Sequence, residues 1–166
     1  MRTPYRKPGK YSLMKSDPLL TEDKFLELEK KLDKLMNYGR PRAAAEVSRL
    51  AELGDFSENA EYQNAKGRLR WINQNIIDIE NQLKHAVIIA PQKQTRTVQL
   101  GHKVTVACGG KQKTYLILGS SETDPEKGII SHGSPIGAAL IGRGAGETVR
   151  IKLAGREVEY KIIKIE

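Results

Sequence analysis

Residues 69–86 have the sequence LRWINQNIIDIENQLKHA and show the clearest periodicity of the chain. Apolar side chains recur there at alternating steps of three and four residues, at Leu69, Ile72, Ile76, Ile79, Leu83 and Ala86. This spacing places them on one stripe of an α-helix and is typical of a coiled-coil seam. The stretch therefore predicts a long helix that buries one face against a second helix.

The second helix is expected earlier in the chain, beginning after Thr21. Thr21 is a suitable N-cap, and the acidic residues Glu22 and Asp23 follow it where they favour the positive end of a helix dipole. The same seam spacing then appears at Phe25, Leu28, Leu32 and Leu35. Proline inside a helix costs about 3 kcal/mol, so Pro41, close behind Gly39, predicts a kink. The seam is expected to resume at Val47 and Leu50.

The two helices predict an antiparallel hairpin, because facing residue numbers in such a pair add to a constant. Here the constant is 111 for Phe25 with Ala86, Leu28 with Leu83, Leu32 with Ile79, Leu35 with Ile76, and Gly39 with Ile72. The reversal then falls between Asp55 and Phe56, next to Gly54. With about 30 residues per arm and 1.5 Å of rise per residue, the hairpin is a rod of roughly 45 Å.

Residues 91–166 predict a second module, a small sheet with one short helix. Two hairpins are expected, one around Gly109-Gly110 and one around Ala154-Gly155, because alternating apolar residues flank each pair. Ser134-Pro135 predicts the start of a short helix that runs to Ile141. Residues 1–20 hold three prolines among basic residues and predict a flexible extension. The fold class is therefore α+β, with the hairpin over residues 21–90.

Composition narrows the class of protein. A net charge of +8 in 166 residues favours a polyanionic partner such as nucleic acid. The single Cys108 and the widely spaced histidines argue against a zinc site. No apolar run approaches the roughly 20 residues that cross a bilayer, and no signal peptide is evident at the start. We therefore expect a soluble cytoplasmic protein with no membrane partner.

The predicted reversal is acidic in this otherwise basic chain. Four carboxylates lie there without a Lys or Arg between Arg49 and Lys66, at Glu52, Asp55, Glu58 and Glu61. Two of them, Asp55 and Glu58, are three residues apart and can both project from the end of the rod. Mg²⁺ prefers a few carboxylates plus water and phosphate oxygens, so this pair could help hold an ion beside one bound by another protein. The spacing alone favours simple helix capping, which is worth about 0.3 to 1 kcal/mol.

The run Gly54-Asp55-Phe56-Ser57-Glu58-Asn59-Ala60-Glu61-Tyr62 resembles the tip signature of the GreA/GreB transcript cleavage factors, Gly-Asp-x-x-Glu-Asn-Ala-(Asp/Glu)-Tyr. The resemblance continues at Arg40-Pro41, Ser134-Pro135-Ile136 and Leu140-Ile141-Gly142, and covers most of residues 21–166. The tip resembles GreB more and the C-terminal motif resembles GreA, so the subtype stays open. Phe56 and the basic extension depart from the usual pattern.

The resemblance implies an accessory factor of transcription and not an enzyme. It implies that the coiled coil enters the secondary channel of RNA polymerase, while an FKBP-like C-terminal domain docks on the coiled coil at the channel entrance. Asp55 and Glu58 would assist Mg²⁺ in the polymerase active site, with no cofactor of the factor's own. The polymerase would then cleave the RNA 3′ end of backtracked or arrested complexes.

Further contacts follow from the same resemblance. Lys66, Arg68 and Arg70 are expected to touch the nascent RNA 3′ segment, although such a trio is more often a solvated face. Candidates for polymerase docking are Ser134, Pro135 and Ile136. A purely structural role is an equal alternative, because a Ser-Pro pair is common at the start of a helix. DNA is a further candidate partner of the basic extension.

Two aromatic residues beside the tip could stack on bases. Trp71 is instead expected to pack across the arm, because its number and that of Arg40 also add to 111. Tyr62 stays open.

Three other functions compete with this interpretation. A channel-binding inhibitor of the same fold is disfavoured because both Asp55 and Glu58 are present. A generic nucleic-acid-binding coiled coil would be expected to have a basic tip. A free-standing metal nuclease lacks a further ligand cluster or a histidine base in the sequence.

Overall fold

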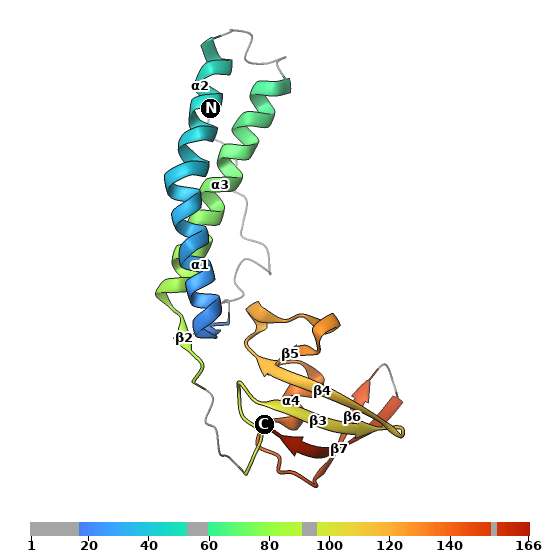
Figure 1. The fold of residues 1–166 in the computed structure, drawn as a ribbon. Coiled ribbons are helices and arrows are strands. Elements are labelled where there is room, and N and C mark those ends of the chain that lie inside the picture. Colours follow the sequence, from blue (N-terminus) through green and yellow to red (C-terminus); the bar gives the residue numbers. More distant parts are fainter. Residues whose placement is uncertain (1–16, 53–59, 91–95, 154–155) are drawn as a thin grey trace, which may run out of the picture.

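The computed structural model describes residues 17–52, 60–90, 96–153 and 156–166. A long helical hairpin stands on a small sheet domain, residues 96–166 (Figure 1). The α+β fold expected from the sequence is confirmed.

The first arm of the hairpin contains three helical segments in unbroken succession: α1 (Glu22–Lys34), a π-helical turn η2 (Leu35–Gly39) and α2 (Arg40–Glu52). Thr21 caps α1 as expected, because its hydroxyl accepts a hydrogen bond from the Lys24 amide at 3.2 Å. In η2 the Arg40 N–H reaches back five residues to the Leu35 carbonyl. Pro41 has no N–H to donate. The interruption expected at Gly39 and Pro41 is thus a widened π-helical turn.

The second arm is α3 (Ala60–Lys84), and it packs along the first arm through two apolar clusters. The cluster nearer the base consists of Leu20, Leu28, Leu32, Leu35, Ile79, Leu83 and Ala86. The cluster farther along consists of Leu32, Leu35, Met36, Ala43, Leu69, Ile72 and Ile76. The antiparallel pairing is confirmed, since Leu28 clusters with Leu83, Leu32 with Ile79 and Leu35 with Ile76. The expected reversal at Asp55-Phe56 lies outside the described residues.

Trp71 does not pack across the arm, and that expectation is wrong. Its side chain is 61% exposed, whereas its neighbour Ile72 is buried in the seam. Consecutive residues of an α-helix are rotated by about 100° from one another. With Ile72 facing the first arm, the Trp71 side chain is therefore turned away toward solvent.

The base of the hairpin is closed by a short parallel pair of strands, β1 (Leu19–Leu20) and β2 (Val87–Ile88). Leu20 is fully buried against Leu28 and Ile79. The expected flexible extension over residues 1–20 is therefore wrong for residues 17–20, which are folded because an apolar Leu20 has a cluster to enter. Residues 1–16 lie outside the described residues.

The sheet domain has five strands in the order β5-β4-β3-β7-β6. They are β3 (Lys103–Cys108), β4 (Lys111–Leu118), β5 (Ile129–Ser131), β6 (Thr148–Leu153) and β7 (Arg156–Ile165). All neighbours pair antiparallel except β4 with β5, which is parallel. The expected turn between β3 and β4 is confirmed, because Gly109 and Gly110 have φ of 54° and 77° and thereby fit a type I′ hairpin.

One helix, α4 (Pro135–Leu140), packs beside this sheet (Figure 1). Its Leu140 is fully buried in the core with the strand residues Val104, Val106, Ile117 and Ile162. Two 3-10 turns, η3 (Ser120–Glu122) and η4 (Pro125–Lys127), fill the connection between β4 and β5. The short helix expected after Ser134 is confirmed, and β5 is an additional strand that the sequence pattern does not predict.

Gly67 offers a direct test of the second arm. It lies exposed within α3, and a methyl group added there would meet no atom within 4 Å. Because glycine in a helix interior costs about 0.5 to 1 kcal/mol relative to alanine, Gly67→Ala is expected to raise the free energy of unfolding by that amount. Denaturant unfolding followed by circular dichroism measures it. A lower midpoint for the variant would contradict a continuous helix at this position.

Candidate functional site

The two residues on which catalysis is expected to depend, Asp55 and Glu58, lie outside the described residues. The chain connects the arms through residues 53–59, between Glu52 at the end of α2 and Ala60 at the start of α3. Glu52 and Glu61 are both exposed, and Glu61 contributes to the electrostatic environment of Arg49. The pKa of Arg49 is raised first by its hydrogen bond to Glu46, and then by the charges of Glu46 and Glu61. The described end of the hairpin is thus bordered by carboxylates.

The basic trio on the second arm divides into two groups. The Lys66 ammonium lies 5.1 Å from the centroid of the Tyr62 ring, within range of a cation–π interaction. Arg70 donates from Nε to the Lys66 carbonyl at 3.4 Å. Arg68 instead lines a groove between the two arms. Lys66 and Arg70 therefore form one basic face next to Tyr62, and Arg68 belongs to another.

The expected docking residues in the sheet domain have different environments. The Ser134 hydroxyl caps α4 by accepting from the Gly137 amide at 3.0 Å, and it donates to the Ser131 carbonyl at 2.7 Å. Ile136 packs against the core of the sheet domain, and Pro135 is exposed. Of these three residues, only Pro135 is exposed, and Ser134 and Ile136 are partly buried.

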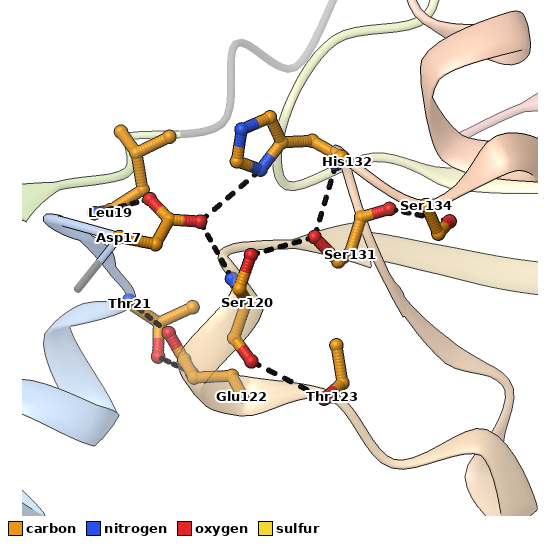
Figure 2. Close-up of polar contacts among 10 residues, drawn as sticks. Asp17, Leu19, Thr21, Ser120, Glu122, Thr123, Ser131, His132 and Ser134 are labelled. Atoms are coloured by element: carbon orange, nitrogen blue, oxygen red, sulfur yellow. Dashed lines mark hydrogen bonds and ion pairs between the residues drawn. The ribbon is translucent and has the colours of Figure 1, made fainter. Parts of the chain in front are cut away.

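A polar junction, residues 17–21 together with residues 119–132, joins the hairpin base to the sheet domain (Figure 2). The Glu122 carboxylate accepts from the Thr21 amide at 2.7 Å and from the Thr21 hydroxyl at 2.6 Å. The Asp17 carboxylate accepts from the Ser120 amide at 2.7 Å and lies 3.4 Å from His132 Nδ1. This junction could not be predicted from the sequence, because the residues that it joins are about a hundred positions apart.

The charge state of Asp17 links the junction to pH. Partial burial acts to raise the pKa of Asp17, but hydrogen bonds from the Ser120 and Leu19 amides and the charge of His132 outweigh it, and the pKa is lowered. A carboxylate with a lowered folded-state pKa adds stability above its ordinary pKa. This contribution is lost as the pH falls through the folded-state pKa.

Both modules match one protein family. The family model "Transcription elongation factor, N-terminal" matches residues 18–88, and "Transcription elongation factor, GreA/GreB, C-term" matches residues 93–166. Transcription elongation factor GreA of Macrococcus caseolyticus is 38% identical over 155 residues, 92% of this chain and 98% of the relative. The chain belongs to the GreA/GreB family of transcription elongation factors. It is thus an accessory factor of transcription and not an enzyme.

A second relative and a solved structure also match most of this chain. Transcription elongation factor GreA of Staphylococcus epidermidis is 37% identical over 150 residues, 89% of this chain and 95% of that protein. A solved structure of GreA factor homolog 1 of Thermus thermophilus is 22% identical, covers 89% of this chain and 97% of that chain, and has a TM-score of 0.41. The N-terminal family match begins at residue 18, so the folded base of the hairpin lies within the part that this GreA/GreB-family chain shares with its relatives.

The described part of this GreA/GreB-family chain contains no group of three His, Cys, Asp or Glu side chains that could hold a metal ion. Among the same residues, none of the helices is both long and apolar enough to span a membrane.

Proposed function

We propose that this chain is a transcript cleavage factor. It binds RNA polymerase through the secondary channel and stimulates the polymerase's own endonucleolytic cleavage of the RNA 3′ end in backtracked or arrested complexes. The observation that carries the proposal is the family signature of residues 54–62 at the point where two in-register helical arms are joined. The hairpin can carry those residues far from the sheet domain, into a partner's interior, while its base stays fixed at the junction.

Asp55 and Glu58 would act together with residues of the polymerase. Their carboxylate oxygens suit Mg²⁺, and a pair leaves positions free for water and phosphate oxygens. A second metal ion held in this way supplies charge stabilisation for the attacking and leaving oxygens of phosphoryl transfer. In this proposal Asp55 and Glu58 share Mg²⁺ with the polymerase only in the complex, and the factor has no cofactor of its own.

The sheet domain would dock at the channel entrance through the α4 region. Because Ser134 caps α4 and Ile136 packs inward, these two side chains hold the helix in place. Pro135 is exposed at the helix start and offers the contact itself. The proposed docking surface is therefore positioned by Ser134 and Ile136 and presented by Pro135.

Lys66 and Arg70 would contact the phosphates of the extruded RNA, on the face beside Tyr62. They hold no metal and transfer no proton, so Lys66→Ala combined with Arg70→Ala is expected to weaken cleavage of long backtracks by about ten-fold, and short ones less. Phosphate contacts release counterions, and the variant should also show a flatter salt dependence. Cleavage rates on short and long backtracks across a salt series measure both effects. If the double variant cleaves both substrates as fast as the parental chain at every salt concentration, Lys66 and Arg70 do not contact the RNA and form only a solvated face.

The decisive experiment adds the chain to a stalled, backtracked polymerase complex that contains a 3′-labelled transcript and Mg²⁺. Release of labelled 3′ fragments is expected. Chain and RNA without polymerase serve as the control and should give no fragments, because the nuclease belongs to the polymerase. Slower elongation without fragment release would instead identify a channel-binding inhibitor. Fragment release without polymerase would identify a free nuclease.

A further inference from the structure

A groove of about 780 Å³ lies between the two arms of the hairpin, at the level of the π-helical turn η2. Its first-arm side comes from consecutive turns of α1, η2 and α2, and its second-arm side comes from α3. It is lined by Lys31, Lys34, Leu35, Tyr38, Gly39, Arg42, Ala43, Glu46, Ala65, Arg68 and Ile72. We call it the hairpin groove. π-helical turns inside α-helices often mark functional sites, and this one forms a wall of the groove.

Four cationic side chains surround the hairpin groove: Lys31, Lys34, Arg42 and Arg68. None of them forms an ion pair with another residue in the described ranges 17–52, 60–90, 96–153 and 156–166. The carboxylate in the groove, Glu46, is already paired with Arg49 at 2.9 Å. A cluster of unpaired cations at one place raises the local potential and favours a ligand with several negative charges.

The cations come from both arms, and their positive charges affect the same part of the hairpin groove. The pKa of Glu46 is lowered first by its hydrogen bond to Arg49, and the charges of Arg42 on α2 and Arg68 on α3 lower it further. Arg42 and Arg68 therefore lie within electrostatic range of one carboxylate between the arms. A ligand in the groove would meet guanidinium groups from both sides, and guanidinium groups suit phosphate oxygens because they can donate two parallel hydrogen bonds.

The remaining lining is apolar and aromatic. Leu35, Ala43 and Ile72 belong to the apolar seam between the arms and also line the groove. Tyr38 projects from the π-helical turn with 71% of its surface exposed. An exposed aromatic ring in a groove with apolar lining residues provides a place for a flat ring to stack. The groove thus joins a polyanion site to a stacking site.

We propose that the hairpin groove binds a phosphorylated nucleotide, with its phosphates against Lys31, Lys34, Arg42 and Arg68 and its base on Tyr38. The volume lies in the range of small-molecule sites, about 300 to 1,000 Å³. The site is separate from Asp55 and Glu58 and from the basic face of Lys66 and Arg70. It needs no polymerase, so it stands whether or not the cleavage activity is found.

The test measures binding by calorimetry with the full-length chain at low salt and without Mg²⁺. Adenosine triphosphate is the probe, and inorganic triphosphate and adenosine are compared with it. The nucleotide is expected to bind about ten-fold more tightly than inorganic triphosphate, because only the nucleotide can stack on Tyr38. Tyr38→Ala should remove this preference, and Tyr38→Phe should retain it.

A pair of charge variants locates the site. Lys34→Ala with Arg42→Ala is expected to weaken nucleotide binding by roughly a hundred-fold, about ten-fold for each charged contact. Lys111→Ala with Lys113→Ala removes the same charge from the exposed start of strand β4, away from the hairpin groove, and should change the affinity only slightly. Equal weakening by both double variants would overturn the proposal, as would equal affinity of the parental chain for adenosine triphosphate and inorganic triphosphate.

A short single-stranded oligoadenylate distinguishes the two sources of this chemistry. If the oligonucleotide competes with adenosine triphosphate in the parental chain and fails to bind the Lys34→Ala, Arg42→Ala variant, the groove is assigned to nucleotides within a strand. Failure of the oligonucleotide to displace adenosine triphosphate would assign the groove to free nucleotides. If the parental chain does not measurably bind adenosine triphosphate, the proposal is overturned for free nucleotides and for strands alike.

Discussion

Chains carrying Asp55→Ala or Glu58→Ala are expected to lose nearly all stimulated transcript cleavage while they still bind RNA polymerase. In the proposed function these carboxylates act on a metal ion, whereas binding depends on the sheet domain and the length of the hairpin. A metal ion contributes several kcal/mol of charge stabilisation, so loss of a ligand is expected to slow cleavage by about 100-fold or more. Cleavage rates and polymerase affinity of each variant measure the two effects separately.

Two further variants sharpen this test. Asp55→Glu keeps the charge but moves the carboxylate by one methylene, and it should also fail because a metal site tolerates little displacement. Glu52→Ala removes one negative charge from the same acidic stretch, at the exposed end of α2, and should retain most activity. Equal losses of binding and cleavage in the Asp55 and Glu58 variants would contradict the separation of docking from chemistry. An equally large loss of cleavage in Glu52→Ala would show that Asp55 and Glu58 contribute only negative charge and not specific metal ligands.

Gly119→Ala is expected to destabilise the chain at the junction between the two modules. A methyl group on Gly119 would overlap the Leu19 carbonyl, which is backbone and cannot swing aside as a flexible side chain does. Relief would require β1 to move away, and the hydrogen bonds of Asp17 to Ser120 and of Thr21 to Glu122 would lengthen. The expected loss in the free energy of unfolding is roughly 3 kcal/mol.

Gly133→Ala is the matched control for this substitution. Gly133 lies in the same region, but a methyl group there would make only an ordinary contact of 3.6 Å with the Ser131 hydroxyl. Thermal unfolding of the two variants and of the parental chain gives the comparison. A melting temperature for Gly119→Ala equal to that for Gly133→Ala would show that the close approach of Leu19 to Gly119 contributes no stability.

The hairpin could be predicted from sequence because its information is local and repeated. Each seam residue, such as Leu28 or Ile79, follows its neighbours by three or four positions, and two such series with one constant sum specify the pairing. The β3–β4 turn was equally accessible, since Gly109 and Gly110 are residue types that tolerate positive φ. These features need no knowledge of distant parts of the chain.

The junction could not be predicted, because its energy comes from contacts distant in sequence. In the sequence, Leu20 belongs to a proline-rich basic segment. Its burial depends on contacts with Leu28 and Ile79, which no local pattern indicates. The Thr21–Glu122 hydrogen bonds join residues from opposite modules. β5 could not be predicted for a related reason, because it has only three residues and depends on parallel pairing with β4. The hairpin groove likewise depends on how the two arms pack at the π-helical turn.

The pairing of β1 with β2 has a consequence for how such a chain can change in size. The polypeptide leaves the base at Leu20 and returns at Val87, directly beside its starting point. The arms between these strands can therefore grow or shrink by matched insertions while the ends stay adjacent and the sheet domain is unaltered. Each seven-residue repeat added to both arms would extend the reach by about 10.5 Å at an unchanged seam. The length of the hairpin can thus change in this architecture without any change in its base or in the sheet domain.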